Sequence, residues 1–234
     1  MKLQYWFNFK IFGLYLLAFI SIASGTLQLD ALNTGLMTGD SSHDPDVPHY
    51  YQMPLPVLLH IVSGVLFNLL SPLQFSSTIR TKLTWLHRCN GGLMIICALC
   101  AGITALLMNE LYPAFGGALK YFGVMTFSLA ICACVMMGII RVKQGDIPAH
   151  RAWMIRATAV ALGPATQRLF FIPAYLILGS IEQWVIGVGI WVGFLVNLAV
   201  AEVFIIPKGS KQVTAKQKGA KQDGPGTMVK TASL

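Results

Sequence analysis

Residues 80–108 read RTKLTWLHRCNGGLMIICALCAGITALLM. The basic residues of this stretch all lie in its first nine positions, and residues 89–108 carry no charge. A helix of about 20 mostly apolar residues crosses the hydrocarbon core of a bilayer, and basic residues collect at the cytoplasmic ends of such helices. The stretch therefore predicts a transmembrane helix over residues 87–108 that begins on the cytoplasmic side.

Five further segments have a similar length and apolar character, at about residues 11–28, 54–75, 119–140, 153–178 and 184–206. The whole chain is 55% hydrophobic with a mean hydropathy of +0.64. Only 11% of its residues are charged, whereas about a quarter are charged in a soluble domain. We therefore predict an all-α integral membrane protein in which residues 1–206 form one domain, a six-helix transmembrane bundle.

The loops between these spans alternate in charge. Basic residues lie before the first span, after the second, after the fourth and after the sixth: Lys2, Lys10, Arg80, Lys82, Arg88, Arg141, Lys143, Arg151 and six lysines of the tail. The other three loops carry mostly acidic residues: Asp30, Asp40, Asp44, Asp46, Glu110 and Glu182, beside Lys120. The positive-inside rule then puts the N and C termini in the cytoplasm. The net charge of +8 comes from basic residues in these loops and the tail, as membrane topology requires. Nucleic acid is therefore not an expected partner.

The two ends of the chain allow further predictions. Lys2, Lys10, the apolar stretch and the small residues at 21–25 resemble a signal peptide, and cleavage of it would leave five spans. An uncleaved first span is the interpretation that keeps the charge alternation complete. The tail over residues 207–234 is rich in Lys, Gly, Gln and Ser. It is predicted to be a disordered basic cytoplasmic segment that contacts anionic lipid head groups.

Polar side chains inside the bilayer are costly and usually face a cavity or the bundle interior. His60 is about 9 Å below the outer end of the second span, and Arg168 about 15 Å below that of the fifth. A shared outer polar cavity is one interpretation, with Gln74 and Glu202 as further lining residues of a binding or transport site. A packing histidine and an arginine bonded to helix carbonyls are the alternative. Glu202 is also expected to pair with Arg156 near the inner ends of their spans.

Two histidines begin the third and fifth spans, and each is followed by arginine: His87-Arg88 and His150-Arg151. Two histidines from different helices are the axial ligands that a b-type haem requires, and neighbouring arginines suit its propionates. The sequence thus predicts haem b near the cytoplasmic face, with its iron between His87 and His150. An interfacial anchor at each helix start is the alternative interpretation.

Several smaller patterns complete the predictions. Cys97-x-x-Cys100 and Cys132-x-Cys134 are interpreted as packing residues rather than a metal site. A solvated loop is the preferred interpretation of the group His43, Asp44, Asp46 and His49, over an external cation site.

Helix geometry supplies three more expectations. Asp146 is expected to cap the fifth span, and Gly163-Pro164 to kink it. Gly189-x-x-x-Gly193 predicts close helix packing, within the chain or between chains. Packing between chains would suit a small subunit of a larger membrane complex.

Three runs of residues carry a resemblance to a known family. They are Leu59-His60-Ile61-Val62-Ser63-Gly64 with Ser71-Pro72-Leu73-Gln74-Phe75 and Ile79-Arg80, then His87-Arg88-x-x-Gly91, and Gly145-Asp146-x-x-x-His150-Arg151-x-Trp153-Met154-Ile155-Arg156 followed by Arg168-Leu169. Together they resemble the bacterial predicted membrane proteins of domain of unknown function 2306, over roughly residues 60–202. This resemblance implies a multi-pass protein of the bacterial inner membrane and supplies no activity.

A weaker similarity is to the cytochrome b561-like fold, in which histidines on four consecutive central helices hold two haems. That similarity implies that His87 and His150 are the pair of ligands of one haem. It places His60 in the pair that would hold the other haem. The fourth span, residues 119–140, has no histidine, so only the inner haem is expected. The implied function is a membrane redox or electron-transfer protein that exchanges electrons with a quinone or a partner subunit. Arg88, Arg151 and Arg168 are its further candidate cofactor-binding residues.

Overall fold

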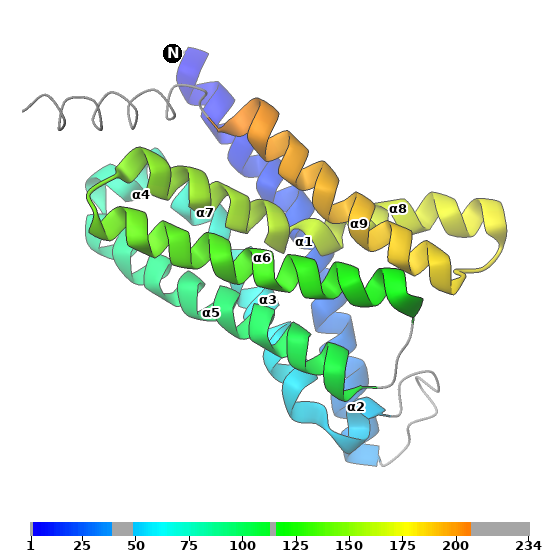
Figure 1. Cartoon of the computed structure of the whole chain (residues 1–234). Helices are drawn as coiled ribbons and strands as arrows, with labels where there is room; N and C mark the ends of the chain where they lie inside the picture. The colour runs from blue at the N-terminus through cyan, green and yellow to red at the C-terminus, as the bar shows by residue number, and fades with distance from the viewer. Residues whose placement is uncertain (1, 39–48, 113–115, 207–234) are drawn as a thin grey trace, which may run out of the picture.

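The computed structural model describes residues 2–38, 49–112 and 116–206, and these form helices and short connections with no strand (Figure 1). The elements in chain order are α1 (Lys2–Thr38), α2 (His49–Gln52), α3 (Pro54–Gln74), α4 (Ser77–Lys82), α5 (Thr84–Leu111), α6 (Gly117–Lys143), α7 (Ile147–Ala161), α8 (Gly163–Leu178), α9 (Gln183–Val200) and a π-helix, η2 (Ala201–Ile205). The predicted tail lies outside the described residues.

Within these described ranges, six segments are long and apolar enough to cross a membrane, as the sequence predicted: Ile11–Met37, Pro54–Gln74, Thr84–Leu111, Gly117–Lys143, Ile147–Leu178 and Gln183–Ile205. The protein is therefore an all-α membrane bundle. The first span extends well beyond the predicted residue 28 and packs against α3, where Gly25 lies against Val65 and Ile61. The cleaved signal peptide stays an untested alternative.

The fifth span is broken, as Gly163-Pro164 predicted. Asp146 caps α7, because its carboxylate accepts a 3.0 Å hydrogen bond from the Ala149 backbone N–H. The helix ends at Ala161, and α8 begins at Gly163 with Pro164 in its first turn. Proline has no N–H to donate and its ring crowds the preceding turn. In Figure 1, α8 consequently leaves the direction of α7 and runs beside α9 as a hairpin.

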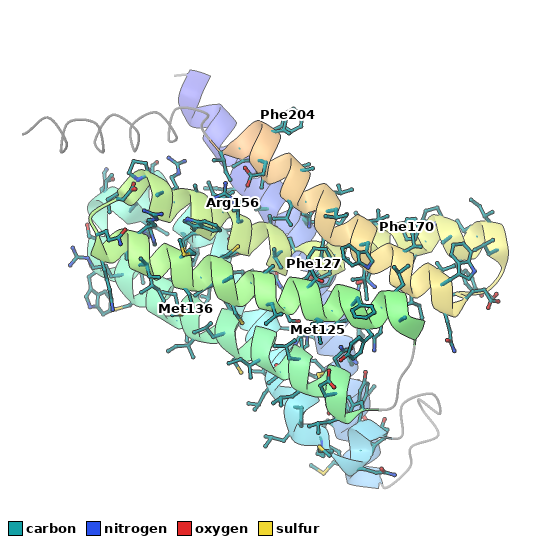
Figure 2. The ribbon with its side chains drawn as sticks, viewed as in Figure 1. Met125, Phe127, Met136, Arg156, Phe170 and Phe204 are labelled. Atoms are coloured by element: carbon teal, nitrogen blue, oxygen red, sulfur yellow. The ribbon has the colours of Figure 1, made fainter. Side chains whose placement is uncertain are left out.

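The core lies where α3, α5, α6, α7 and α9 meet. Phe67, Met94 and Val135 are almost completely buried in it. Phe127 of α6 stacks on Phe194 of α9, with ring centroids 4.3 Å apart. Large apolar side chains cover the outside of the bundle, and Phe204 points away from it in Figure 2. An apolar exterior is what the hydrocarbon core of a bilayer requires.

The glycine pair of α9 packs within the chain. A Cβ atom on Gly193 would stand 2.7 Å from the Gly163 carbonyl oxygen and 2.8 Å from the Gln167 backbone nitrogen. A Cβ on Gly189 would meet the Phe171 ring. Both glycines therefore allow α8 and α9 to approach closely. The structure therefore shows the predicted packing within the chain, and docking of a partner subunit stays an untested alternative.

Candidate functional site

A cavity of about 290 Å³ lies inside the bundle and is lined by residues of all six spans. Its wall is largely apolar, with Phe67, Phe127 and Phe194 among its side chains. The polar residues on the wall are Ser21, Gln28, His60, Asn68, Ser128, Gln167 and Arg168. An apolar pocket with a few convergent polar groups is the usual form of a small-molecule site. The structure thus brings His60 and Arg168 to one cavity, as their depths predicted, but the wall of this cavity is largely apolar and not polar as expected.

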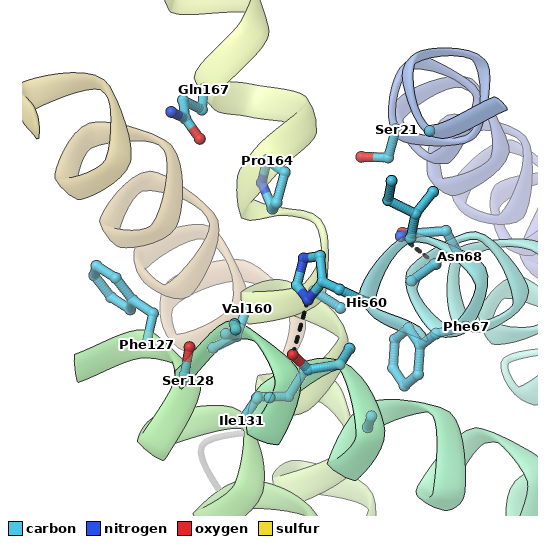
Figure 3. A pocket seen from close by; sticks show the side chains of 18 of the residues that line it. Ser21, His60, Phe67, Asn68, Phe127, Ser128, Ile131, Val160, Pro164 and Gln167 are labelled. Carbon is cyan, nitrogen blue, oxygen red and sulfur yellow. Dashed lines mark hydrogen bonds between the residues drawn. The ribbon is translucent and has the colours of Figure 1, made fainter. Parts of the chain in front are cut away.

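His60 is held in a fixed orientation on α3. Its Nδ1 lies 2.9 Å from the Ala101 carbonyl oxygen of α5. A carbonyl oxygen only accepts hydrogen bonds, so Nδ1 carries a proton, and Nε2 is an acceptor whenever the ring is neutral. Nε2 has no hydrogen-bond partner among the described residues. Figure 3 shows the ring in the cavity, between Asn68 and Ser21 on one side and Pro164 on the other.

Arg168 brings a permanent positive charge to the same cavity. One of its N–H groups, on Nη1, donates to the Pro164 carbonyl oxygen at 2.9 Å. This contact agrees with the structural alternative, but a guanidinium has five N–H donors and the others have no partner among the described residues. No described carboxylate pairs with Arg168. A charge near the centre of a spanning helix costs roughly 2.5 to 3.5 kcal/mol on insertion scales, so this arginine needs a compensating partner.

Two cavity residues were not predicted from the sequence. Asn68 is 5% exposed, and its Oδ1 has no hydrogen-bond partner among the described residues. Ser21 of α1 has a buried Oγ that also lacks a hydrogen-bond partner among the described residues. Asn68 follows His60 by eight residues with Gly64 halfway, so all three lie on one face of α3. That spacing was the available signal for Asn68, whereas Ser21 depends on how α1 packs.

Gln74 and Glu202 do not line the cavity, so this part of the prediction is wrong. Gln74 lies on the same face of α3 as His60 but at the far end of the helix. There its amide Nε2 donates to the His87 carbonyl oxygen at 3.1 Å. Glu202 belongs to η2 and forms an ion pair with Arg156 of α7. The expected ion pair is thus confirmed. Gln74 and Glu202 each form a contact between helices in the predicted cytoplasmic half of the bundle.

The Arg156–Glu202 pair has the geometry of a strong interaction. Arg156 Nε donates to Glu202 Oε1 and Nη2 to Oε2, the latter at 3.1 Å. The guanidinium carbon also lies 4.7 Å from the centroid of the Trp153 ring (Figure 2 labels Arg156). A two-point contact between arginine and a carboxylate is both stronger and more directional than a single hydrogen bond. The pair therefore connects η2 to α7.

We expect Glu202→Gln to lower the free energy of unfolding by about 1 to 3 kcal/mol, because Arg156 loses its charged acceptor. Thermal unfolding in detergent measures the change. Asp30→Asn is the matched control, since Asp30 is exposed on α1. The exchanged variant, Arg156→Glu with Glu202→Arg, should recover part of the loss. Equal stability of the Glu202→Gln variant and the control would contradict a stabilising pair.

His87 and His150 belong to the first turns of α5 and α7, and these two helices begin at the same end of the bundle, the predicted cytoplasmic end (Figure 1). His150 Nδ1 donates to the Gly138 carbonyl oxygen of α6 at 2.8 Å. His87 Nδ1 is buried and has no hydrogen-bond partner among the described residues. Arg88 and Arg151 are both exposed. The two histidines thus lie at the same end of the bundle, while a haem between their rings stays a prediction.

The other candidate ligands do not form a metal site among the described residues. All five cysteines are free, and Cys97 and Cys134 are buried as packing residues. Within the described ranges there is no group of three or more His, Cys, Asp or Glu residues that could hold a metal ion. Of the external loop group, His43, Asp44 and Asp46 lie outside the described residues, as does the side chain of His49.

Comparison with known proteins adds a family. The family model described as "Predicted membrane protein (DUF2306)" matches residues 57–205, which is more than half of the chain. No curated protein matches. No solved structure matches either, so the similarity to the cytochrome b561-like fold gains no support. The matched region contains His60, Asn68 and Arg168 of the cavity as well as His87 and His150. The chain belongs to this family of predicted membrane proteins, domain of unknown function 2306.

Proposed function

We propose that this protein binds one amphipathic molecule in the membrane-embedded cavity around His60 and Arg168. The observation that carries the proposal is Arg168, which has no carboxylate partner among the described residues and lies on the wall of a largely apolar cavity. Intramembrane charges usually serve a ligand, an ion or a proton pathway. Here the cation and the apolar wall together suit a molecule with a polar head and an apolar body.

The size and composition of the cavity support this proposal. Its volume of about 290 Å³ is near the lower end of the range of about 300 to 1,000 Å³ for small-molecule pockets. Aromatic rings of Phe67, Phe127 and Phe194 line it beside the polar groups. A single apolar chain or ring can pack against these side chains. The transmembrane helices line the cavity, so the site lies within the bilayer, where amphipathic molecules concentrate.

Native mass spectrometry of the full chain, released from a mild detergent, tests the proposal. We expect one bound amphipathic molecule per chain, or uptake of one after addition of dodecanoate, dodecanol or dodecylamine. These three probes share a 12-carbon chain and differ in head-group charge. A chain that carries no such molecule and takes up none of the three probes would contradict the proposal.

A haem protein is the second candidate function, and one observation favours it. His150 Nδ1 donates to a backbone carbonyl, which leaves Nε2 free and fixes the ring. Histidines that bind metals are typically oriented in this way. His87 and His150 would be the axial ligands and Arg88 and Arg151 would hold propionates. A haem supplies one-electron chemistry, which suits exchange with a quinone or partner subunit in a bacterial inner membrane.

If this second candidate is correct, dithionite-reduced minus oxidised spectra of purified protein should show a b-type band at about one haem per chain. His87→Ala and His150→Ala should each lose most of that signal, because a bis-histidine haem needs both rings. His60→Ala is the control, since His60 lies in the separate cavity. Colourless wild-type protein, purified after expression with added haem precursor, would reject this candidate.

A further inference from the structure

Hydrogen-bond donors of Arg168 at the cavity lack acceptors among the described residues. Arg168 offers five N–H donors, and only its bond to the Pro164 carbonyl oxygen uses one of them within the described part of the chain. Arginine stays protonated at any pH a cell experiences. The described residues include no carboxylate paired with it. The cavity therefore has a permanent positive charge and several hydrogen-bond donors in need of an acceptor.

Arg168 cannot easily satisfy these donors at the membrane surface. It stands ten residues before Leu178, the last residue of α8, which is about 15 Å along the helix axis. Long basic side chains reach the interface only from positions near helix ends. Arg168 is half-buried and lines the cavity. Whatever compensates it must therefore come into the cavity.

A second polar side chain of the cavity wall, Asn68, is incompletely hydrogen-bonded. Asn68 is more than nine-tenths buried on the cavity wall, and its Oδ1 is left without a partner among the described residues. Its amide nitrogen is already used, since Nδ2 donates to the Gly64 carbonyl oxygen at 2.9 Å. Buried polar atoms nearly always have a partner in protein or in water. Asn68 Oδ1 and His60 Nε2 are thus two acceptors near the cavity that no described residue satisfies.

We infer that the cavity recognises the anionic head group of its ligand, through charge-assisted hydrogen bonds from Arg168. The inference rests on the proposed function and names the ligand class. A carboxylate or a phosphate matches the fork of N–H groups on a guanidinium and can accept two parallel hydrogen bonds. The apolar body of the ligand lies against Phe67, Phe127 and Phe194. Cationic amphiphiles are excluded by the charge of Arg168.

Binding of three matched probes tests the inference on the full chain in phosphatidylcholine nanodiscs. Dodecanoate, dodecanol and dodecylamine are compared by equilibrium dialysis, with empty nanodiscs as the blank. We expect dodecanoate to bind at least about tenfold more tightly than the other two. Arg168→Gln should weaken dodecanoate binding by about 10- to 100-fold. Arg168→Lys should weaken it less, because lysine keeps the charge and loses the fork.

Lys143→Gln is the control, since it removes one exposed positive charge at the opposite end of the bundle. It should bind dodecanoate like the wild type. Equal affinity for the three probes, or an Arg168→Gln variant that keeps its dodecanoate affinity, would overturn anion recognition and leave the proposed function standing. Absence of saturable binding of every probe would overturn both. Displacement of dodecanoate by phosphatidylglycerol would support anion recognition and identify a lipid phosphate as the head group.

Discussion

Gly64→Leu should abolish ligand binding in the cavity while the protein stays folded. A Cβ atom on Gly64 meets no atom within 4 Å, and Gly64 lines the cavity between His60 and Asn68. A leucine side chain would therefore extend into the space that the ligand needs. Replacing a glycine inside a helix also removes a cost of up to about 1 kcal/mol. We expect dodecanoate binding in nanodiscs to be lost and the unfolding temperature to stay at or above that of the wild type.

The matched control is Gly92→Leu. Gly92 is an exposed residue inside α5, and an added Cβ atom there also meets nothing within 4 Å. This variant makes the same chemical change outside the cavity, so it should bind dodecanoate normally. Gly64→Ala should weaken binding only in part, because its methyl group fills less of the space. A Gly64→Leu variant that binds dodecanoate like the Gly92→Leu variant would show that the ligand does not occupy this cavity.

The topology could be predicted because its causes are local. Apolar length and the side on which basic residues fall do not depend on which helices are neighbours. The same is true of the cap at Asp146 and the break at Gly163-Pro164, which both act within one turn of helix. The depth of a residue follows from its position in a span. For this reason His60 and Arg168 could be placed at similar levels before their helices were arranged.

The composition of the site could be predicted only in part, because lateral packing is not a local property. Gln74 shares a helix face with His60, yet that face contacts the start of α5 at one end and the cavity at the other. Ser21 reaches the cavity because α1 packs against α3, which no spacing in the sequence specifies. The pair Gly189 and Gly193 indicates a close contact without identifying α8 as the helix that makes it.

Gly193→Ala should destabilise the bundle more than any other single-methyl change considered for this chain. The added Cβ atom would stand 2.7 Å from the Gly163 carbonyl oxygen and 2.8 Å from the Gln167 nitrogen. These are backbone atoms, so no rotamer change relieves the clash and α8 must move away from α9. Overpacking of this kind costs about 1 to 3 kcal/mol. The expected result is a lower midpoint of thermal unfolding in detergent.

The displacement of α8 from α9 should also change the shape of the cavity, because Gln167 of α8 and Phe194 of α9 both line it. Dodecanoate binding by Gly193→Ala should therefore weaken along with its stability. Gly92→Ala is the control, since the same methyl group meets no neighbour there and alanine is the better helix former. Equal unfolding midpoints for the two variants would mean that α8 and α9 are not in backbone contact. A change in oligomeric state without loss of monomer stability would instead assign the glycine pair to an interface between chains.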